Sequence, residues 1–271
     1  MKFYKFIYFC FLLLPFNLIA CQPVETPDQC TQNPSGINPF FKAGKYDKCN
    51  DLPVAPMLNK FDKAVLDICG DWGSTPKRED FRNLLDKKEY KNYIDEIYEG
   101  LDHQVFTPNA DLDTFKKELT ELWFNNHGFT HIMCGQPRRG RLGGMHFFGR
   151  YLQAQKNQWV GRYYDDDLMD EVSDKVFLIG VAFKNSRGQL TVDPKKSYDL
   201  LHANEIILHA TKAYKGLSKN SQLVERANGR CIYDNEDVNY VFVARKNSIV
   251  TFFAAFNPTC TRGQTECACI R

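Results

Sequence analysis

The first half of the chain spaces its apolar side chains as amphipathic helices do. In the clearest stretch, apolar residues recur every three or four positions and charged residues occupy the opposite face. The apolar set is Leu112, Phe115, Leu119 and Leu122, and the charged set is Lys116, Lys117 and Glu118. Shorter stretches of similar pattern lie at residues 61–69, 81–85 and 90–98. We therefore predict a helical subdomain over residues 57–125.

After about residue 175 the pattern changes to that of strands. Residues 176–183 are almost continuously apolar, which is typical of a buried strand. A polar turn at residues 185–188 and a return strand at residues 189–192 would complete a hairpin. These features predict antiparallel pairing in the C-terminal half of the chain.

The last part of the pattern adds a helix and a second hairpin. Residues 202–214 place Ile206, Ile207 and Ala210 on one helical face. Strands are predicted at residues 240–244 and 249–253, with a turn at Lys246-Asn247. The fold class predicted from the whole pattern is α+β.

The N-terminus has the layout of a secretory signal. Lys2 and Lys5 precede a short apolar run, and a small residue, Ala20, stands before Cys21. The run is shorter than the roughly 20 residues that a membrane-spanning helix needs. We expect residues 1–20 to be a signal peptide and the protein to be exported, either secreted or periplasmic. Because residues 18–21 also resemble a lipobox, a lipid anchor at Cys21 stays open beside ordinary secretion.

The cysteines agree with export into an oxidising compartment. Of ten cysteines, Cys10 leaves with the signal; if Cys21 carries lipid, an even number remains for disulfides. These are Cys30, Cys49, Cys69, Cys134, Cys231, Cys260, Cys267 and Cys269. The sequence selects no pairing among them. A zinc site formed by the last three is the weaker alternative, since they lack the CxxC pairs of common zinc modules.

The cysteines also help to delimit two flanking segments. Residues 21–56 are rich in Pro, Asn, Gly and Asp, and we interpret them as a cysteine-containing tether or surface segment. Residues 259–271 form a cysteine-rich tail.

Composition narrows the class of partner. The chain has 271 residues, 43% hydrophobic and 25% charged, with a net charge of +2 that falls to zero without Lys2 and Lys5. Such a chain can bury a core, but it lacks the basic excess of proteins that coat nucleic acid. A charged partner would therefore be bound by local clusters.

One such cluster lies between the two halves of the chain. His131 and His146 flank a Gly/Pro loop that contains Arg138, Arg139 and Arg141, which suits an anion. Imidazoles titrate near pH 6.5, so that one can accept a proton while another donates it. Two histidines beside a cation suit cleavage of a phosphodiester by its neighbouring 2′-hydroxyl. A structural histidine on a strand would explain His131 equally well.

The other histidines and the acidic residues give weaker evidence for a functional site. His103 and His127 fall in predicted loops, whereas His202 and His209 belong to a predicted helix as surface or capping residues. The acidic run at residues 165–171 is more typical of a solvated loop or helix start than of a metal site.

Two short elements carry a resemblance to a known family. Residues 128–136 are similar to Gly-Phe-Glu-His-Val-Phe-Val-Gly-Glu, and residues 143–148 to Ser-Gly-Phe-His-Asn-Trp followed by a helix. Both elements resemble the EndoU family of uridylate-specific endoribonucleases. The resemblance implies a catalytic region over residues 126–258 with two antiparallel sheets flanked by helices.

The resemblance also implies catalytic roles. His146 matches the general base of the family and His131 the general acid. The third catalytic residue of the family is a lysine on a strand that leads toward a helix. Lys196 is the favoured match, with Lys195 as the alternative.

Substrate-binding positions follow from the same resemblance. Ser197 falls near a serine that helps to select uracil, and Thr251 and Phe253 match a Thr/Ser-x-Tyr element whose ring packs against the nucleoside. Phe253 departs from that element because it lacks a hydroxyl. Gln136 replaces a glutamate of the family, which removes a charge near His131 and alters its pKa.

The function expected from these features is an exported endoribonuclease that cleaves single-stranded RNA at uridylates and leaves 2′,3′-cyclic phosphate ends. Arg138, Arg139 and Arg141 would guide phosphates. The resemblance also implies Mn²⁺ as a cofactor, for which the sequence assigns no ligand. We expect no stable protein partner. Two alternatives stay open: a catalytically weak or inactive RNA-binding protein on the same scaffold, and a disulfide-stapled surface-binding protein whose histidines are structural.

Overall fold

The computed structural model describes residues 37–44, 52–163, 176–218, 229–235, 238–255 and 269. The predicted signal peptide, the lipobox cysteine and the acidic run at 165–171 lie outside these residues, as does the predicted tail apart from Cys269.

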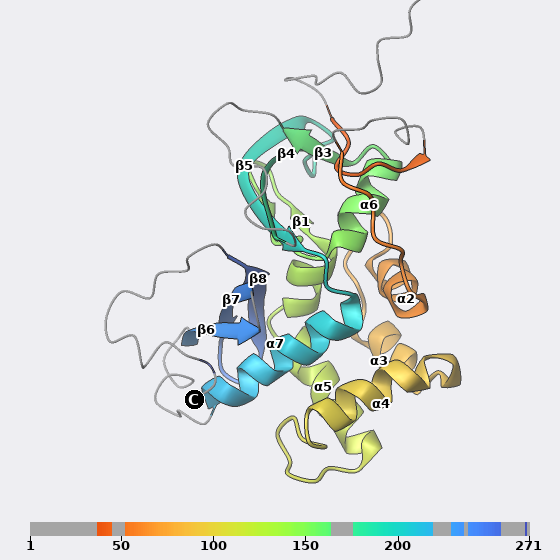
Figure 1. The fold of residues 1–271 in the computed structure, drawn as a ribbon, viewed down its shortest axis with the longest axis vertical. Coiled ribbons are helices and arrows are strands. Elements are labelled where there is room, and N and C mark those ends of the chain that lie inside the picture. The colour runs from red at the N-terminus through yellow and green to blue at the C-terminus, as the bar shows by residue number, and fades with distance from the viewer. Residues whose placement is uncertain are drawn as a thin grey trace, which may run out of the picture.

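Helices make up the first half of the described chain, which confirms the prediction from apolar spacing (Figure 1). A short 3₁₀ helix, η2 (Lys88–Tyr90), joins two of them. The α-helices are α2 (Lys60–Cys69), α3 (Arg78–Asp86), α4 (Lys91–Gly100) and α5 (Leu112–Phe124). The start of α2 is fixed by a capping box in which Asn59 and Asp62 each accept the other's backbone N–H.

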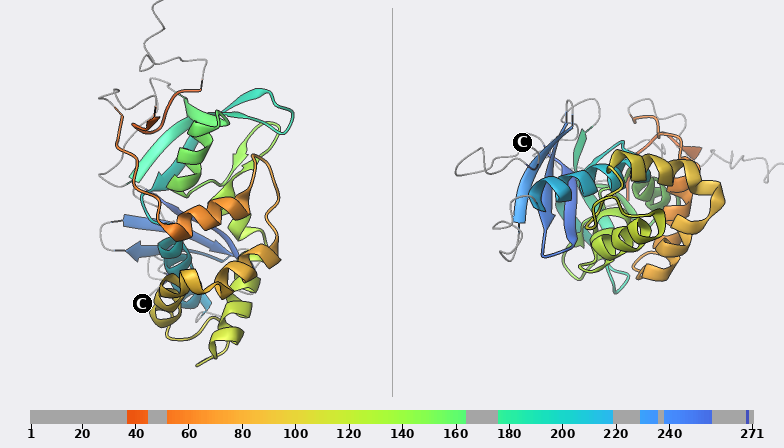
Figure 2. Two further views of the ribbon diagram at one scale, coloured as in Figure 1. Left: turned by 90° about the vertical axis from the view of Figure 1, so that its right-hand side faces the viewer. Right: turned by 90° about the horizontal axis from the view of Figure 1, so that it is seen from below.

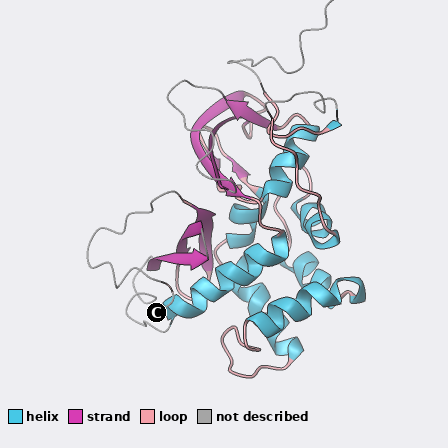
Figure 3. Ribbon diagram, viewed as in Figure 1, coloured by secondary structure: helices cyan, strands magenta, loops and turns pink. Residues whose placement is uncertain are grey.

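Two three-stranded antiparallel sheets form the second half, so the α+β fold class is also confirmed (Figure 3). The first sheet has the order β3-β4-β5, with strands β3 (Val160–Tyr163), β4 (Val176–Lys184) and β5 (Leu190–Asp199). The second has the order β6-β7-β8, with strands β6 (Gly229–Asn235), β7 (Val238–Ala244) and β8 (Ile249–Ala254). A small hairpin pairs β1 (Gln136–Pro137) with β2 (Leu142–Gly143).

Strand β5 extends well beyond the predicted return strand at residues 189–192. Its register pairs Ile179 with Lys196 and Val181 with Asp193, so β5 carries one extra residue opposite Gly180. This arrangement is a β-bulge, which leaves a residue of the ladder unpaired and so tolerates Pro194. Because proline rarely occurs inside a strand, the sequence pattern predicts that the strand ends before Pro194.

Two further helices connect the sheets to the helical half. Helix α6 (Phe148–Lys156) packs against β3 and α2, and α7 (Ala203–Ser218) contacts α2, α4 and all three strands of the second sheet. Figure 2 shows α7 between that sheet and the helices α4 and α5. The buried apolar side chains form one continuous core across both halves of the chain.

The two histidines of the predicted helix have specific partners. The His202 backbone N–H donates to Glu205 at the start of α7, as a capping residue would, and its ring lies 2.6 Å from an oxygen of fully buried Asp62. His209 is not a surface residue. It is half-buried, its Nδ1 lies 2.8 Å from the Tyr233 hydroxyl, and burial lowers its pKa to about 4.

Two disulfides join described residues, in agreement with the cysteine count. One links Cys69 at the end of α2 to Cys134, and the other links Cys231 on β6 to Cys269. Because Cys269 is in a disulfide, the alternative of a zinc site that includes it is wrong. Cys30, Cys49, Cys260 and Cys267 lie outside the described residues.

Among the described residues, no helix combines the length and apolar character that crossing a bilayer requires.

Candidate active site

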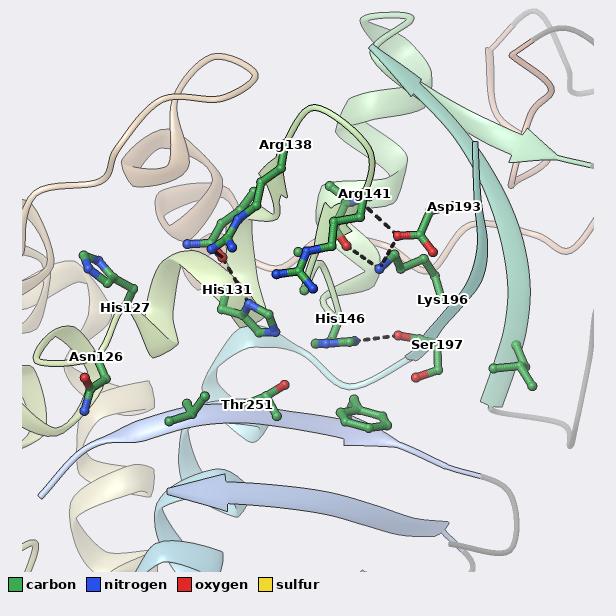
Figure 4. A pocket seen from close by; sticks show the side chains of 17 residues that line it. Asn126, His127, His131, Arg138, Arg141, His146, Asp193, Lys196, Ser197 and Thr251 are labelled. Carbon is green, nitrogen blue, oxygen red and sulfur yellow. Dashed lines mark hydrogen bonds and ion pairs between the residues drawn. The ribbon is translucent and has the colours of Figure 1, made fainter. Parts of the chain in front are cut away.

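A pocket of about 720 Å³ lies where β5, β8 and the segment 126–146 meet (Figure 4). The structure brings most of the predicted site residues to its walls. These are His131, Arg138, Arg141, His146, Lys196, Ser197, Thr251 and Phe253. Arg139 is exposed and does not line the pocket; its carbonyl accepts a hydrogen bond of 3.3 Å from the Asn185 side chain. The side chain of Lys195 lies outside the described residues.

His131 lies on a one-turn π-helix, η3 (Thr130–Cys134), and not on the strand of the structural alternative. The approach to η3 passes close to β8, because a Cβ on Gly128 would lie 2.6 Å from the Ile249 carbonyl oxygen. The turn ends at Gly135, whose φ of 76° favours glycine and whose N–H donates to the Thr130 carbonyl over 2.9 Å.

A buried cation holds the end of η3 in place. Arg150, which is 1% exposed, donates hydrogen bonds to the carbonyls of Cys134 (3.0 Å) and Gly70 (2.8 Å). Its guanidinium carbon lies 5.7 Å and 5.2 Å from the ring centroids of Trp72 and Trp159. Burial lowers the pKa of Arg150 to about 10, so it remains charged at neutral pH. The Cys69–Cys134 disulfide also links the last residue of η3 to the end of α2.

The segment of the second histidine is joined to η3 by its backbone. The Met145 N–H donates to the His131 carbonyl over 2.7 Å, and the His146 N–H donates to the Ile132 carbonyl over 2.8 Å. The two segments cross at Gly144, where φ is 64° and a Cβ would lie 1.8 Å from the His131 carbonyl oxygen. This crossing sets the imidazole centroids of His131 and His146 5.8 Å apart, with the planes inclined at 53°.

His146 is held as a neutral base. Its Nδ1 lies 2.8 Å from the Ser197 carbonyl oxygen, and because a carbonyl can only accept, Nδ1 carries the hydrogen and Nε2 keeps its lone pair. Phe253 stacks on the ring with centroids 5.1 Å apart. Burial, aided by His131 and the charge of Lys196, lowers the pKa of His146 to about 3.

His131 is held in a different environment. Its Nδ1 lies 3.2 Å from the Gln136 side-chain oxygen, a contact that raises its pKa. Burial has the larger effect and lowers the pKa below 6.5, and the positive charges of Lys196, Arg138 and Arg141 act in the same direction. The two imidazoles thus have different proton affinities, with His131 the more readily protonated.

Lys196 enters the pocket as part of a partly buried ion pair. Its ammonium lies 2.8 Å from an oxygen of Asp193 and also donates to the Leu142 carbonyl. The same Asp193 oxygen accepts the Leu142 N–H over 3.0 Å. Residues three apart on a regular strand face opposite ways, but the bulge at Pro194 brings Asp193 and Lys196 to one face. Asp193 was not identified from the sequence, and only this bulge could have revealed it.

Three further pocket residues bear on binding. The Thr251 hydroxyl is covered from solvent and makes no hydrogen bond to any described residue, which is costly for a buried polar atom unless a ligand supplies the partner. Asn126 and His127 also line the pocket. The sequence predicts a loop at His127 and offers no signal that this loop faces the pocket.

Within the ranges that the structure describes, no three His, Cys, Asp or Glu side chains gather as metal ligands would. The described residues therefore contain no three-ligand cluster that would hold Mn²⁺.

The crossing at Gly144 can be tested by substitution. Gly144→Ala should lower the free energy of unfolding by roughly 2–4 kcal/mol, because alanine is strained at this φ and its Cβ collides with the His131 carbonyl. Gly140→Ala is the matched control in the neighbouring loop, where a Cβ meets nothing within 4 Å. Urea denaturation of both variants measures the difference, and equal stabilities would contradict the steric argument.

Comparison with known proteins agrees with this geometry. A family model described as bacterial EndoU nuclease matches residues 125–256. No curated protein matches the chain. The chain is also similar to the solved structure of XendoU, titled a splicing independent snoRNA processing endoribonuclease, with 17% sequence identity and a TM-score of 0.45. That alignment covers 73% of this chain and 76% of the other. The family match spans both histidine elements and shows that residues 125–256 form an EndoU-like endoribonuclease region.

Proposed function

We propose that the protein cleaves single-stranded RNA on the 3′ side of uridylates by transphosphorylation. The observation that carries this proposal is the pair of unlike imidazoles, 5.8 Å apart, beside the ammonium of Lys196. One ring is fixed as a neutral acceptor and the other takes up a proton more readily. In-line attack by a 2′-hydroxyl needs such a pair on the two sides of the phosphorus atom.

The reaction begins at His146. Its Nε2 lone pair takes the proton of the 2′-hydroxyl, and the 2′-oxygen forms a bond to phosphorus. The Ser197 carbonyl, 2.8 Å from Nδ1, then stabilises the imidazolium that results. With a pKa of about 3, His146 is neutral near pH 7 and can accept a proton, but it is a weak base. Proton transfer to His146 therefore occurs as the bond between the 2′-oxygen and phosphorus forms.

His131 completes the reaction. Protonated at Nε2, it gives its proton to the 5′-oxygen as the bond between phosphorus and that oxygen breaks. The products are a 2′,3′-cyclic phosphate and a free 5′-hydroxyl, without a covalent enzyme intermediate. Gln136 holds Nδ1, so that Nε2 is the nitrogen directed at the substrate.

The cations stabilise the phosphorane. An ammonium has three N–H donors, and Lys196 uses two of them on Asp193 and the Leu142 carbonyl, which leaves one for a phosphate oxygen. Arg138 and Arg141 line the same pocket with exposed guanidinium groups and guide the phosphates of the strand.

Selection of uridine is assigned to β5 and β8. The Thr251 hydroxyl gains from the substrate the hydrogen bond that the described protein does not supply, and Ser197 lies in the same pocket. Phe253 offers an aromatic surface to the nucleoside, and stacking contributes about 1–3 kcal/mol per base. The missing hydroxyl of Phe253 leaves orientation to the other two residues.

The site of action is proposed from the N-terminal sequence. Residues 1–20 direct export, and the protein acts outside the cytoplasm either free or tethered through lipid at Cys21.

The mechanism is tested with a single-uridine RNA oligonucleotide and its analogue with 2′-deoxyuridine at that position. We expect cleavage of the first alone, since the analogue has no nucleophile. His146→Ala should lower kcat at least about 100-fold. His103→Ala, an exchange outside the pocket, should stay close to the wild-type rate. Cleavage of both oligonucleotides would contradict the mechanism, and tight binding without cleavage would favour an inactive RNA-binding protein.

The pKa order of the two imidazoles predicts the pH profile. Activity requires neutral His146 and protonated His131, so kcat/KM should fall as pH rises through the pKa of His131, which lies below 6.5. Gln136→Glu places a carboxylate beside Nδ1, which raises this pKa and should move the falling limb upward by about one pH unit.

Gln136→Leu is the matched control, since it removes the contact that raises the pKa and should move the limb downward. Rates of a fluorogenic uridine substrate between about pH 5 and about pH 9 measure both shifts. A falling limb that stays in place in both variants would remove His131 as the acid.

A further inference from the structure

A second, smaller groove of about 300 Å³ adjoins the catalytic pocket. His127, Gln136 and Arg138 line both, so the two spaces share a wall. The far side of the groove is the exposed loop Gly73–Thr75, which follows α2. In Figure 4, His127 and Arg138 lie on the His131 side of the pocket, opposite Lys196 and Ser197.

The lining of the groove is polar and suits an anion. Ser74, Thr75 and Thr130 contribute hydroxyl-bearing side chains, Arg138 a guanidinium and His127 an imidazole. Of the residues that the structure describes, no Asp or Glu lines it. Hydroxyl and guanidinium groups are among those that bind phosphate and ribose oxygens in protein–nucleic acid contacts.

The groove is also fixed relative to the general acid. The His127 carbonyl accepts the His131 N–H over 2.8 Å, and Thr130, the neighbour of His131, lines the groove itself. In Figure 4, His146 lies on the side of His131 that faces Ser197, away from His127, and Phe253 stacks on the His146 ring. A strand that crosses the pocket therefore passes from the base at one end, past the acid, to the groove.

We propose that this groove is a subsite for the RNA strand on the 3′ side of the cleaved bond, where it holds the next phosphate. The inference rests on the proposed function, because His131 protonates the departing 5′-oxygen and so marks the 3′ portion of the substrate. Arg138 then serves two phosphates, the scissile one and the one that follows it. The smallest substrate that is cleaved efficiently therefore has one more phosphate, on its 3′ side, than a dinucleotide.

The subsite is tested by comparing kcat/KM for UpA, UpApA and ApUpA. The 3′-extended UpApA should be cleaved with a kcat/KM about tenfold higher than that of UpA, the gain of one charge-assisted phosphate contact. The 5′-extended ApUpA should show no such gain. In Thr75→Glu, a carboxylate in the groove should bring the ratio of UpApA to UpA down toward one.

Asn92→Glu is the matched control, since it adds the same charge at an exposed position on α4 and should keep the wild-type ratio. Equal kcat/KM for UpA and UpApA in the wild type would overturn the subsite while leaving the mechanism intact. A gain from the 5′ extension, or an unchanged ratio in Thr75→Glu, would overturn it as well. Failure to cleave all three substrates would instead refute the proposed function, and the subsite with it.

Discussion

Two backbone hydrogen bonds hold together the two segments that carry the histidines of the candidate active site. They join the His131 and Ile132 carbonyls to the N–H groups of Met145 and His146 where the two segments cross at Gly144. Only a residue without a Cβ allows that approach. Because both partners in each bond are backbone groups, the bonds fix the Cα positions of the two histidines. Each imidazole is then oriented by a contact through its Nδ1.

Contacts on both sides hold this crossing in place. Arg150 and the Cys69–Cys134 disulfide hold the end of η3 against the end of α2. The helical half of the chain therefore supports the segment that carries His131. On the opposite wall of the pocket, the bulge in β5 directs the Lys196 side chain into the pocket, where it pairs with Asp193. Burial by these elements, more than any single charge, separates the proton affinities of His131 and His146.

Much of this arrangement could be predicted from the sequence, and the parts that could not share a physical cause. Apolar periodicity located the helices and β4, because those elements bury a continuous face. The two histidine elements were recognisable because each is contiguous in the sequence. The place of Asp193 in the pocket depends on a bulge at Pro194, a residue that usually ends a strand. The role of Arg150 depends on the Gly70 carbonyl, 80 residues away in the sequence. Arg139 was grouped with its neighbours because the sequence cannot show which way each side chain of a short loop points.

The protonation states of the two imidazoles can be measured directly. In ¹⁵N-labelled protein, the ring nitrogen shifts of His131 and His146 report both tautomer and pKa. His146 should remain neutral with its proton on Nδ1 down to about pH 4, while His131 takes up its proton at a higher pH that is still below 6.5. A His146 that protonates before His131 as pH falls, or one that carries its proton on Nε2, would contradict the assignment of base and acid.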